Sequence, residues 1–166
     1  MMMEEATTTV TENQGERVLI VEDDPATRTG LAELVQAWGF QTEEASDGED
    51  GFRKVTSFRP AIIVSDLVMP RMGGHDLLRT LKDQLSDITF ILLTAQGTIE
   101  SAVEAIKDGA YDYLSKPVDP QRLRILLNKA VERQETLREV KLLRAMAIEV
   151  VKYGERLARS GLHVDR

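Results

Sequence analysis

Four short polar stretches of this chain carry the side chains that could do chemistry, and each directly follows an apolar run. They are the acidic triplet Glu22-Asp23-Asp24, the single acid Asp66, the hydroxyl of Thr94 and the amine of Lys116. Carboxylate oxygens are the ligands that Mg²⁺ prefers, and a lysine or a threonine can donate hydrogen bonds to phosphate oxygens. An aspartate can also attack phosphorus and carry the phosphoryl group as an acyl phosphate. These residue types therefore indicate a site for a divalent cation and a phosphoryl group.

The apolar runs before these residues have the length and composition of buried β-strands. From residue 17 to about residue 118, short β-branched runs alternate five times with longer amphipathic segments. Connections of that length require parallel strands with helices on both faces of the sheet. Because ligands of such α/β sheets bind beyond the carboxyl ends of the strands, we expect the four polar stretches to meet at one edge.

Helix signals fall between the predicted strands. Asp24 is placed as an N-cap and Pro25 as the first helical residue, and Gly39 is placed to end that helix. The second helix is predicted to open at Asp47. The polar run 41–45 predicts an edge strand, whereas the near-continuous apolar runs of the first, third and fourth strands predict central strands.

Composition limits the classes of function. The chain has 166 residues, of which 42% are hydrophobic, and this suits one domain with an appendage. It has no cysteine, which excludes disulfides and thiolate chemistry and fits a reducing cytoplasm. There is no run of about 18 apolar residues and no signal-peptide pattern, so we expect no contact with a membrane.

The net charge of −7 is unevenly distributed. Residues 1–119 carry 10 Lys and Arg against 22 Asp and Glu, whereas residues 120–166 carry 11 against 6. The acidic part is a poor candidate for direct nucleic-acid binding, and the basic tail is better interpreted as a solvated helix face than as a nucleic-acid patch. We expect a disordered lead-in (1–16), one domain (17–131), and a helical linker with a frayed tail (132–166).

The C-terminal part predicts a long helix. After Pro120 there is no further proline, and apolar residues recur at two heptad positions. The first position holds Leu123, Ala130, Leu137 and Val151, and the second holds Leu126, Val140 and Ala147. Arg133 and Arg144 interrupt this seam. The pattern favours a coiled-coil or dimerisation linker over a long amphipathic helix without a partner.

Four motifs of the chain resemble those of the response-regulator receiver domain of two-component signalling. They are VLIVEDDP, IIVSDLVMPRMGG, ILLTAQG and AYDYLSKPVD, and the resemblance covers roughly residues 17–131. It implies a doubly wound α/β fold whose five-stranded parallel sheet has the order 2-1-3-4-5, followed by an extended C-terminal helix. The threonine-rich start and the long helix are most similar to the receiver and linker of NtrC-type (sigma-54-dependent) transcription regulators.

The resemblance implies a Mg²⁺ site around a phosphoacceptor. Asp66 matches the phosphoacceptor aspartate. Glu22 and Asp23 match the acidic pair that holds Mg²⁺, although the family often has two aspartates there. Asp66 itself and the backbone carbonyl of Val68 complete the implied ligand set.

The resemblance also implies a conformational switch. Thr94 and Lys116 match the residues that bind the phosphoryl group, and Tyr113 matches the aromatic residue that turns inward when Thr94 moves. Pro117 in the family follows a cis peptide bond, and we expect one between Lys116 and Pro117. The surface formed by the fourth helix, the fifth strand and the fifth helix would then repack.

Val68 and Gln96 are expected at the mouth of the pocket, where they would modulate it. An apolar Val68 cannot orient an attacking water molecule through its side chain, so we expect a long-lived phosphoryl group. His75 is interpreted as a surface residue of the third helix rather than as a phosphocarrier or a metal ligand.

The sequence therefore predicts a phosphoacceptor signalling domain rather than an enzyme. A sensor histidine kinase would phosphorylate Asp66, and the change would control a homodimer through the linker helix or the switching surface, with transcription as the output. A Mg²⁺-dependent aspartyl-phosphate phosphatase is one alternative, but such enzymes carry a second aspartate where Val68 stands. A phosphorylation-independent interaction module is another. The chain has no nucleotide-binding loop, and we expect a piece that ends after the linker rather than a short natural regulator.

Overall fold

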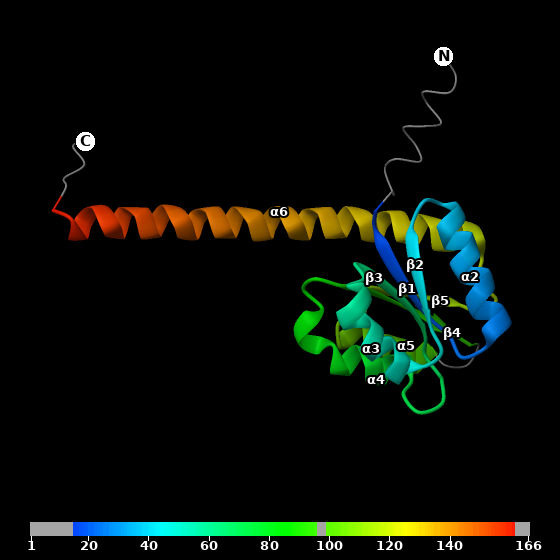
Figure 1. Ribbon diagram of the computed structural model, residues 1–166. Coiled ribbons are helices and arrows are strands. Elements are labelled where there is room, and N and C mark those ends of the chain that lie inside the picture. The colour runs from blue at the N-terminus through cyan, green and yellow to red at the C-terminus, as the bar shows by residue number, and fades with distance from the viewer. Residues whose placement is uncertain (1–14, 96–98, 162–166) are drawn as a thin grey trace, which may run out of the picture. The chain divides into compact units, whose positions relative to one another are not determined.

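A computed structural model describes residues 15–95 and 99–161 of the chain. These residues form a five-stranded parallel sheet with helices on both faces, and a long helix, α6, follows the last strand (Figure 1). The strand order β2-β1-β3-β4-β5 confirms the predicted topology. The predicted lead-in lies almost entirely outside the described residues, as do Gln96 and the end of the tail.

The element bounds follow the alternation of the sequence. In chain order they are β1 (Arg17–Val21), α2 (Pro25–Ala37), β2 (Gln41–Ala45), α3 (Gly48–Phe58), β3 (Ile62–Asp66), α4 (Gly74–Thr80), a 3₁₀ turn (Lys82–Gln84), β4 (Thr89–Thr94), α5 (Ile99–Lys107), β5 (Asp112–Ser115) and α6 (Pro120–Arg159). The central strands β3 and β4 are buried at every residue, whereas β2 at the edge alternates between exposed and half-buried positions and is buried only at Ala45. This matches the apolar and polar runs, because a central strand of such a sheet is covered on both faces.

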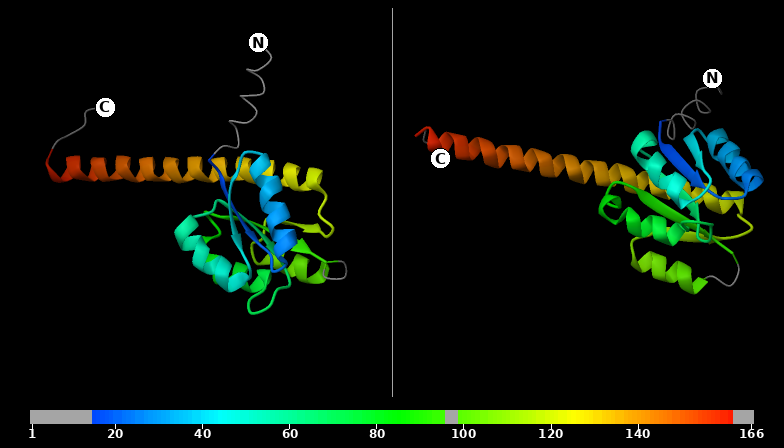
Figure 2. Two further views of the ribbon diagram at one scale, coloured as in Figure 1. Left: turned by 45° about the vertical axis from the view of Figure 1, so that its right-hand side comes forward. Right: turned by 60° about the horizontal axis from the view of Figure 1, so that its bottom comes forward.

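Two apolar cores lie on opposite faces of the sheet. On one face α2 and the start of α6 pack against residues such as Ile20 and Val64, and on the other face α3, α4 and α5 pack against residues such as Leu19 and Ile63 (Figure 2). Successive residues of one strand thus serve different cores.

The fully buried side chains of the helix α5 are small, and Ile106 packs against the core while only partly buried. Its buried residues are Ala102 and Ala105, whereas Ile99 and Val103 are 47% and 44% exposed. Two alanines bury little apolar area, so α5 gains less from packing than a helix that buries leucines.

Polar side chains hold α6 against the first residue of β4. Arg133 Nη1 and Gln134 Nε2 both donate to Thr89 Oγ1, at 2.7 and 2.8 Å. Thr89 and Gln134 are buried, and the Arg133 guanidinium lies 5.7 Å from the centre of the Tyr111 ring. These contacts fix α6 to the strands two and three residues beyond the last apolar core residue, Val131.

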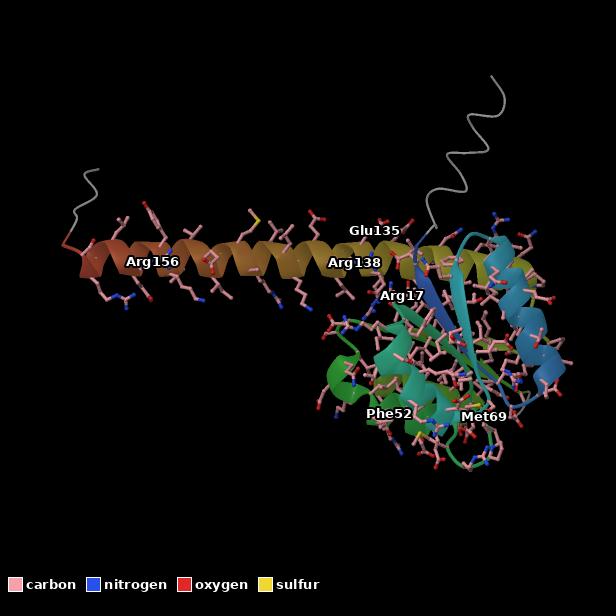
Figure 3. The ribbon with its side chains drawn as sticks, viewed as in Figure 1. Arg17, Phe52, Met69, Glu135, Arg138 and Arg156 are labelled. Atoms are coloured by element: carbon pink, nitrogen blue, oxygen red, sulfur yellow. The ribbon has the colours of Figure 1, made fainter. Side chains whose placement is uncertain are left out.

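The chain divides into two compact units, Met1–Gln134 and Glu135–Arg166. The second unit is helical to Arg159, and Figure 3 shows side chains such as Arg138 and Arg156 around that helix. The first part of the predicted heptad seam belongs to the domain core instead, because Leu123, Leu126 and Ala130 are buried against the sheet. Only the later seam positions are available for a second helix.

The helix α3 begins at a buried carboxylate. Asp47 Oδ1 accepts the Asp50 N–H at 2.8 Å, and Asp47 Oδ2 accepts the Arg71 Nε–H at 2.7 Å. The Asp47 side chain is only 3% exposed. The hydrogen bond from Asp50, and after it the Arg71 guanidinium, holds the pKa of Asp47 below its ordinary value, although burial acts in the opposite direction.

We predict that Asp47 makes folding stability depend on pH in the acid range. A depressed folded-state pKa contributes stability above the unfolded pKa of about 3.9, and this contribution disappears as the pH falls through the folded value. At pH 7, Asp47→Asn should cost about 1–2 kcal/mol in urea unfolding. The difference from the native chain should shrink between about pH 4 and pH 3.

The exposed acid Asp76 of α4 provides the control, because Asp76→Asn removes the same charge from a solvated position. This variant should unfold at the same urea concentration as the native chain, both at pH 7 and at pH 3. If Asp47→Asn lowered the free energy of unfolding equally at pH 3 and pH 7, the depressed pKa of Asp47 would not be the source of the pH dependence.

Candidate functional site

The carboxyl ends of four neighbouring strands meet at one edge of the sheet. The register pairs Val21 with Ser65, Asp66 with Leu93, and Thr94 with Ser115. The residues that follow β1 and β5 therefore lie beside the last residues of β3 and β4. This arrangement brings together the polar stretches that the sequence analysis placed at one edge.

Glu22, Asp23 and Asp66 form an acidic cluster at this edge. One carboxylate oxygen from each lies within 4.8 Å of the others. Glu22 is 1% exposed and Asp66 is 8% exposed, whereas Asp23 faces solvent. Two of the acids are thus withdrawn from water, and the third lies on the solvent-exposed side of the cluster.

Lys116 places its ammonium between the two buried acids. Its Nζ lies 2.6 Å from Glu22 Oε1 and 2.9 Å from Asp66 Oδ2. Burial lowers the pKa of Lys116, but its hydrogen bonds with Glu22 and Asp66 outweigh that effect and raise the pKa above its ordinary value. The lysine therefore stays charged and orients the Asp66 carboxylate.

The cluster retains an excess of negative charge. The neighbouring Glu22 carboxyl group, and after it burial, raises the pKa of Asp23. Three carboxylates face one ammonium, and such crowding favours a bound cation. Mg²⁺–oxygen distances of about 2.1 Å put two ligands of one ion at most about 4.2 Å apart. The cluster therefore fits Mg²⁺, with small side-chain rotations or with a water molecule in place of one carboxylate.

Thr94 ends β4 with an unused hydroxyl group. The residue is 0% exposed, and its Oγ1 has no hydrogen-bond partner among the described residues. Its backbone carbonyl accepts the Lys116 N–H at 2.7 Å. A buried hydroxyl without a partner is unfavourable by about 1–3 kcal/mol, so Thr94 would gain from a new acceptor nearby.

Three further residues singled out from the sequence lie outside the acidic cluster. Asp24 caps α2, because its side chain accepts the Thr27 N–H at 3.0 Å. Val68 is 65% exposed in the loop after β3. Tyr113 is half-buried and packs against the core on the α3, α4 and α5 face.

The peptide bond between Lys116 and Pro117 is cis, the geometry expected from the sequence. His75 differs from its interpretation as a surface residue. Its Nε2 lies 2.7 Å from Asp108 Oδ2, and its side chain is 16% exposed. It therefore joins α4 to the residue after α5, away from the acidic cluster.

Sequence reasoning missed the contacts that hold the site's surroundings. The bond of Lys116 to Glu22 was not foreseen, nor was the Arg28 Nη1–H donated to the Glu22 carbonyl at 3.0 Å. The ion pair between Asp47 and Arg71 was also missed. The two ion pairs join segments 94 and 24 residues apart, and the one available signal was that Glu22, Lys116 and Asp47 lie near predicted strand ends.

The chain matches the family model for the response regulator receiver domain over residues 18–128. Regulatory protein AtoC of Escherichia coli is 30% identical over 149 residues, which cover 90% of this chain and 32% of AtoC. The C4-dicarboxylate transport transcriptional regulatory protein DctD of Pseudomonas aeruginosa is 32% identical over 145 residues, covering 87% and 31%. This chain thus spans about a third of the length of these relatives.

Solved structures show the same similarity. A response regulator receiver domain protein from Clostridium thermocellum superposes with a TM-score of 0.71 at 31% identity, covering 74% of this chain and 98% of that one. NtrX from Brucella abortus superposes with a TM-score of 0.71 at 29% identity, covering 76% and 29%. No helix within residues 15–95 and 99–161 is long and apolar enough to cross a membrane. With its sheet order, its acidic cluster and these matches, the chain belongs to the response regulator receiver domain family, whose members are phosphoacceptor signalling modules rather than classical enzymes.

Proposed function

We propose that this chain is a phosphorylation-dependent switch in which Asp66 accepts a phosphoryl group from a sensor histidine kinase. The observation that carries the proposal is the position of Asp66, whose carboxylate contacts Lys116 at 2.9 Å and lies in the cluster with Glu22 and Asp23. Glu22, Asp23, Asp66 and the Val68 carbonyl would hold Mg²⁺. When bound, the ion would neutralise charge on the phosphoryl oxygens.

The residues of the chain would share the work of phosphoryl transfer. Lys116 holds Asp66 Oδ2, which leaves Oδ1 to attack phosphorus. The new carboxylate–phosphorus bond forms as the bond from phosphorus to the donor nitrogen breaks, and the electron pair returns to that nitrogen. Lys116 then pairs with a phosphoryl oxygen.

The unsatisfied Thr94 hydroxyl supports a switch linked to this step. A phosphoryl group on Asp66 would offer the acceptor that Thr94 lacks. Movement of Thr94 would change the space beside half-buried Tyr113 on the neighbouring strand β5. The surface of α5, β5 and α6 would then repack, and α5 is suited to this because it is packed through Ala102 and Ala105.

The output would pass through a homodimer, and the second unit supports a specific seam. Leu143, Met146, Val150, Tyr153 and Leu157 recur at spacings of three and four residues. The first four are more than half exposed. This seam is uninterrupted, unlike the predicted seam with its Arg144, and it fits a coiled coil with a second copy.

The relatives support a role in transcription, since AtoC and DctD are named as regulatory proteins. Control of transcription would depend on parts of a longer protein. The proposed phosphoryl donor is a kinase that uses ATP, which implies a cytoplasmic location. A phosphatase role receives less support, because Val68 stands where such enzymes have a second acid.

We predict that acetyl phosphate with Mg²⁺ adds one phosphoryl group to the chain, as measured by intact-protein mass spectrometry. Asp66→Asn should abolish the addition, because the attacking oxygen is lost. Removal of Mg²⁺ with a chelator should slow it by at least about a hundredfold, since the metal supplies several kcal/mol of charge stabilisation.

Asp76→Asn is the control, as it removes an exposed acid outside the cluster and should be phosphorylated normally. Phosphorylation of Asp66→Asn at the native rate would refute the assignment of the acceptor. Steady turnover of varied phosphoesters would favour the phosphatase, and a native chain that neither gains phosphate nor responds to beryllofluoride would favour the interaction module.

We predict that the phosphoryl group on Asp66 persists well beyond seconds and that Val68→Asn shortens its lifetime. An amide side chain at this exposed position could orient water, and one hydrogen bond worth about 1 kcal/mol corresponds to roughly a fivefold faster loss. Phosphate release over time measures the lifetime. Val68→Leu is the matched control and should leave it unchanged; loss within seconds in the native chain, with no effect of Val68→Asn, would contradict the prediction.

We predict that Met146→Gln weakens self-association at least about tenfold in sedimentation measurements, because each dimer would lose two buried apolar side chains. Ile148→Gln is the matched control. Ile148 is 54% exposed and Met146 is 55% exposed, but Ile148 lies outside the seam and should not matter. Equal effects of the two substitutions, or a native chain that is monomeric with and without phosphorylation, would argue against this seam.

A further inference from the structure

The loop of residues 67–73 directly follows Asp66, is tied to the sheet at its start, and is closed by a hydrogen bond between its two ends. The Leu67 N–H donates to the Leu93 carbonyl, and the Gly74 N–H donates to the Leu67 carbonyl, both at 2.9 Å. Gly73 allows this path, because a Cβ atom there would lie 2.7 Å from the Leu67 carbonyl oxygen. Met69, labelled in Figure 3, lies between these ends and is 9% exposed.

A second set of contacts holds the far side of this loop against the start of α3. The Arg71 Nε–H donates to Asp47 Oδ2 at 2.7 Å, and an Nη2–H of the same guanidinium donates to the same oxygen. The Gly48 N–H donates to the Met72 carbonyl at 2.8 Å. A Cβ atom on Gly48 would lie only 2.5 Å from that carbonyl oxygen, so the two segments are in close contact.

Arg71 occupies a backbone conformation that is unfavourable for its residue type. Its φ of 67° is in the left-handed region, which costs a non-glycine residue about 1–2 kcal/mol. Glycine would be free of that cost but could not reach Asp47. The contacts of the Arg71 guanidinium with Asp47 therefore offset the cost of the strained conformation.

Helix capping alone does not account for Asp47. The cap uses Oδ1, which accepts the Asp50 N–H, whereas Oδ2 is left for Arg71. An asparagine could supply the cap oxygen but would put an amide group or a neutral oxygen before Arg71. The nearly buried Asp47 carboxylate thus links α3 to the loop, because one oxygen caps the helix and the other binds Arg71.

We propose that Asp47 and Arg71 are positioning residues for Mg²⁺ binding, because their ion pair fixes the loop that contains Val68 and directly follows Asp66. This inference rests on the proposed function, in which the Val68 carbonyl is a metal ligand. Residues that orient metal ligands from outside the ligand set typically affect affinity tenfold or more. The pair would hold the carbonyl in place before the ion arrives and so reduce the cost of ordering the loop on binding.

We predict that Asp47→Asn and Arg71→Gln each weaken Mg²⁺ binding about tenfold in an NMR titration of the full chain. The two substitutions change the local charge in opposite directions. A long-range charge effect alone would therefore weaken binding in Asp47→Asn and strengthen it in Arg71→Gln. Weaker binding in both variants distinguishes the ion pair from such an effect.

The double variant and a matched arginine complete the test. Asp47→Asn with Arg71→Gln should be no weaker than either single variant, because the singles break the same contact. Arg53→Gln is the control, since Arg53 is 68% exposed on α3 and pairs with Asp50 rather than with the loop. It should bind Mg²⁺ like the native chain. The NMR spectra also report whether each variant is folded.

The outcomes separate this inference from the proposed function. If the native chain binds Mg²⁺ and is phosphorylated on Asp66 but both single variants bind Mg²⁺ as the native chain does, the positioning role is wrong and the switch stands. Opposite shifts in the two variants would also overturn the positioning role. If the native chain binds no Mg²⁺, the metal-dependent switch itself fails, and the positioning role fails with it.

Discussion

Repulsion among three carboxylates at one edge of the sheet is the constraint on which the other features of the domain depend. Glu22, Asp23 and Asp66 bring ligand oxygens within 4.8 Å of one another, and two of these acids are buried. Lys116 compensates for part of this charge by contacting both buried acids. Negative charge remains in excess, so the site favours a cation, and in the proposed function it uses that cation to admit a phosphoryl group.

Strand β4 links this edge to the rest of the domain through two threonines in opposite states. Thr94 at the carboxyl end is buried with a hydroxyl that lacks a partner among the described residues, whereas Thr89 at the other end accepts hydrogen bonds from Arg133 and Gln134 of α6. A movement at the Thr94 end could give its hydroxyl a hydrogen-bond acceptor, whereas the Thr89 end is held by its hydrogen bonds with α6. A change at the phosphoacceptor would therefore be taken up near Thr94 and α5 rather than by displacement of the whole strand.

The parts of this structure that could be predicted from sequence are those set by local pattern. Apolar runs followed by acids located β1 and β3, and Asp24 with Pro25 located the start of α2. The pairs Asp47–Arg71 and Thr89–Gln134 could not be found in this way, because each joins segments 24 or 45 residues apart. Their contact depends on the path of a loop or the rotation of a helix, and the composition of the segments specifies neither.

The helix α6 shows why a periodic pattern can be assigned to the wrong partner. Apolar residues spaced by three and four positions fit both a sheet-facing helix and a coiled-coil seam, since the two periods, 3.6 and 3.5, are nearly equal over a few turns. Up to Gln134 the sheet covers these residues, as it does Leu123 and Ala130. Beyond that residue apolar side chains are exposed on several faces of the helix, and they include Val140 and Val151 of the predicted seam as well as Leu143 and Met146. A seam extrapolated from the domain half of the helix includes Arg144, whereas a seam through Leu143, Met146 and Val150 contains no charged residue. The buried anchor at Thr89 fixes which face of the helix packs on the sheet, and this is information that the periodicity of the sequence does not contain.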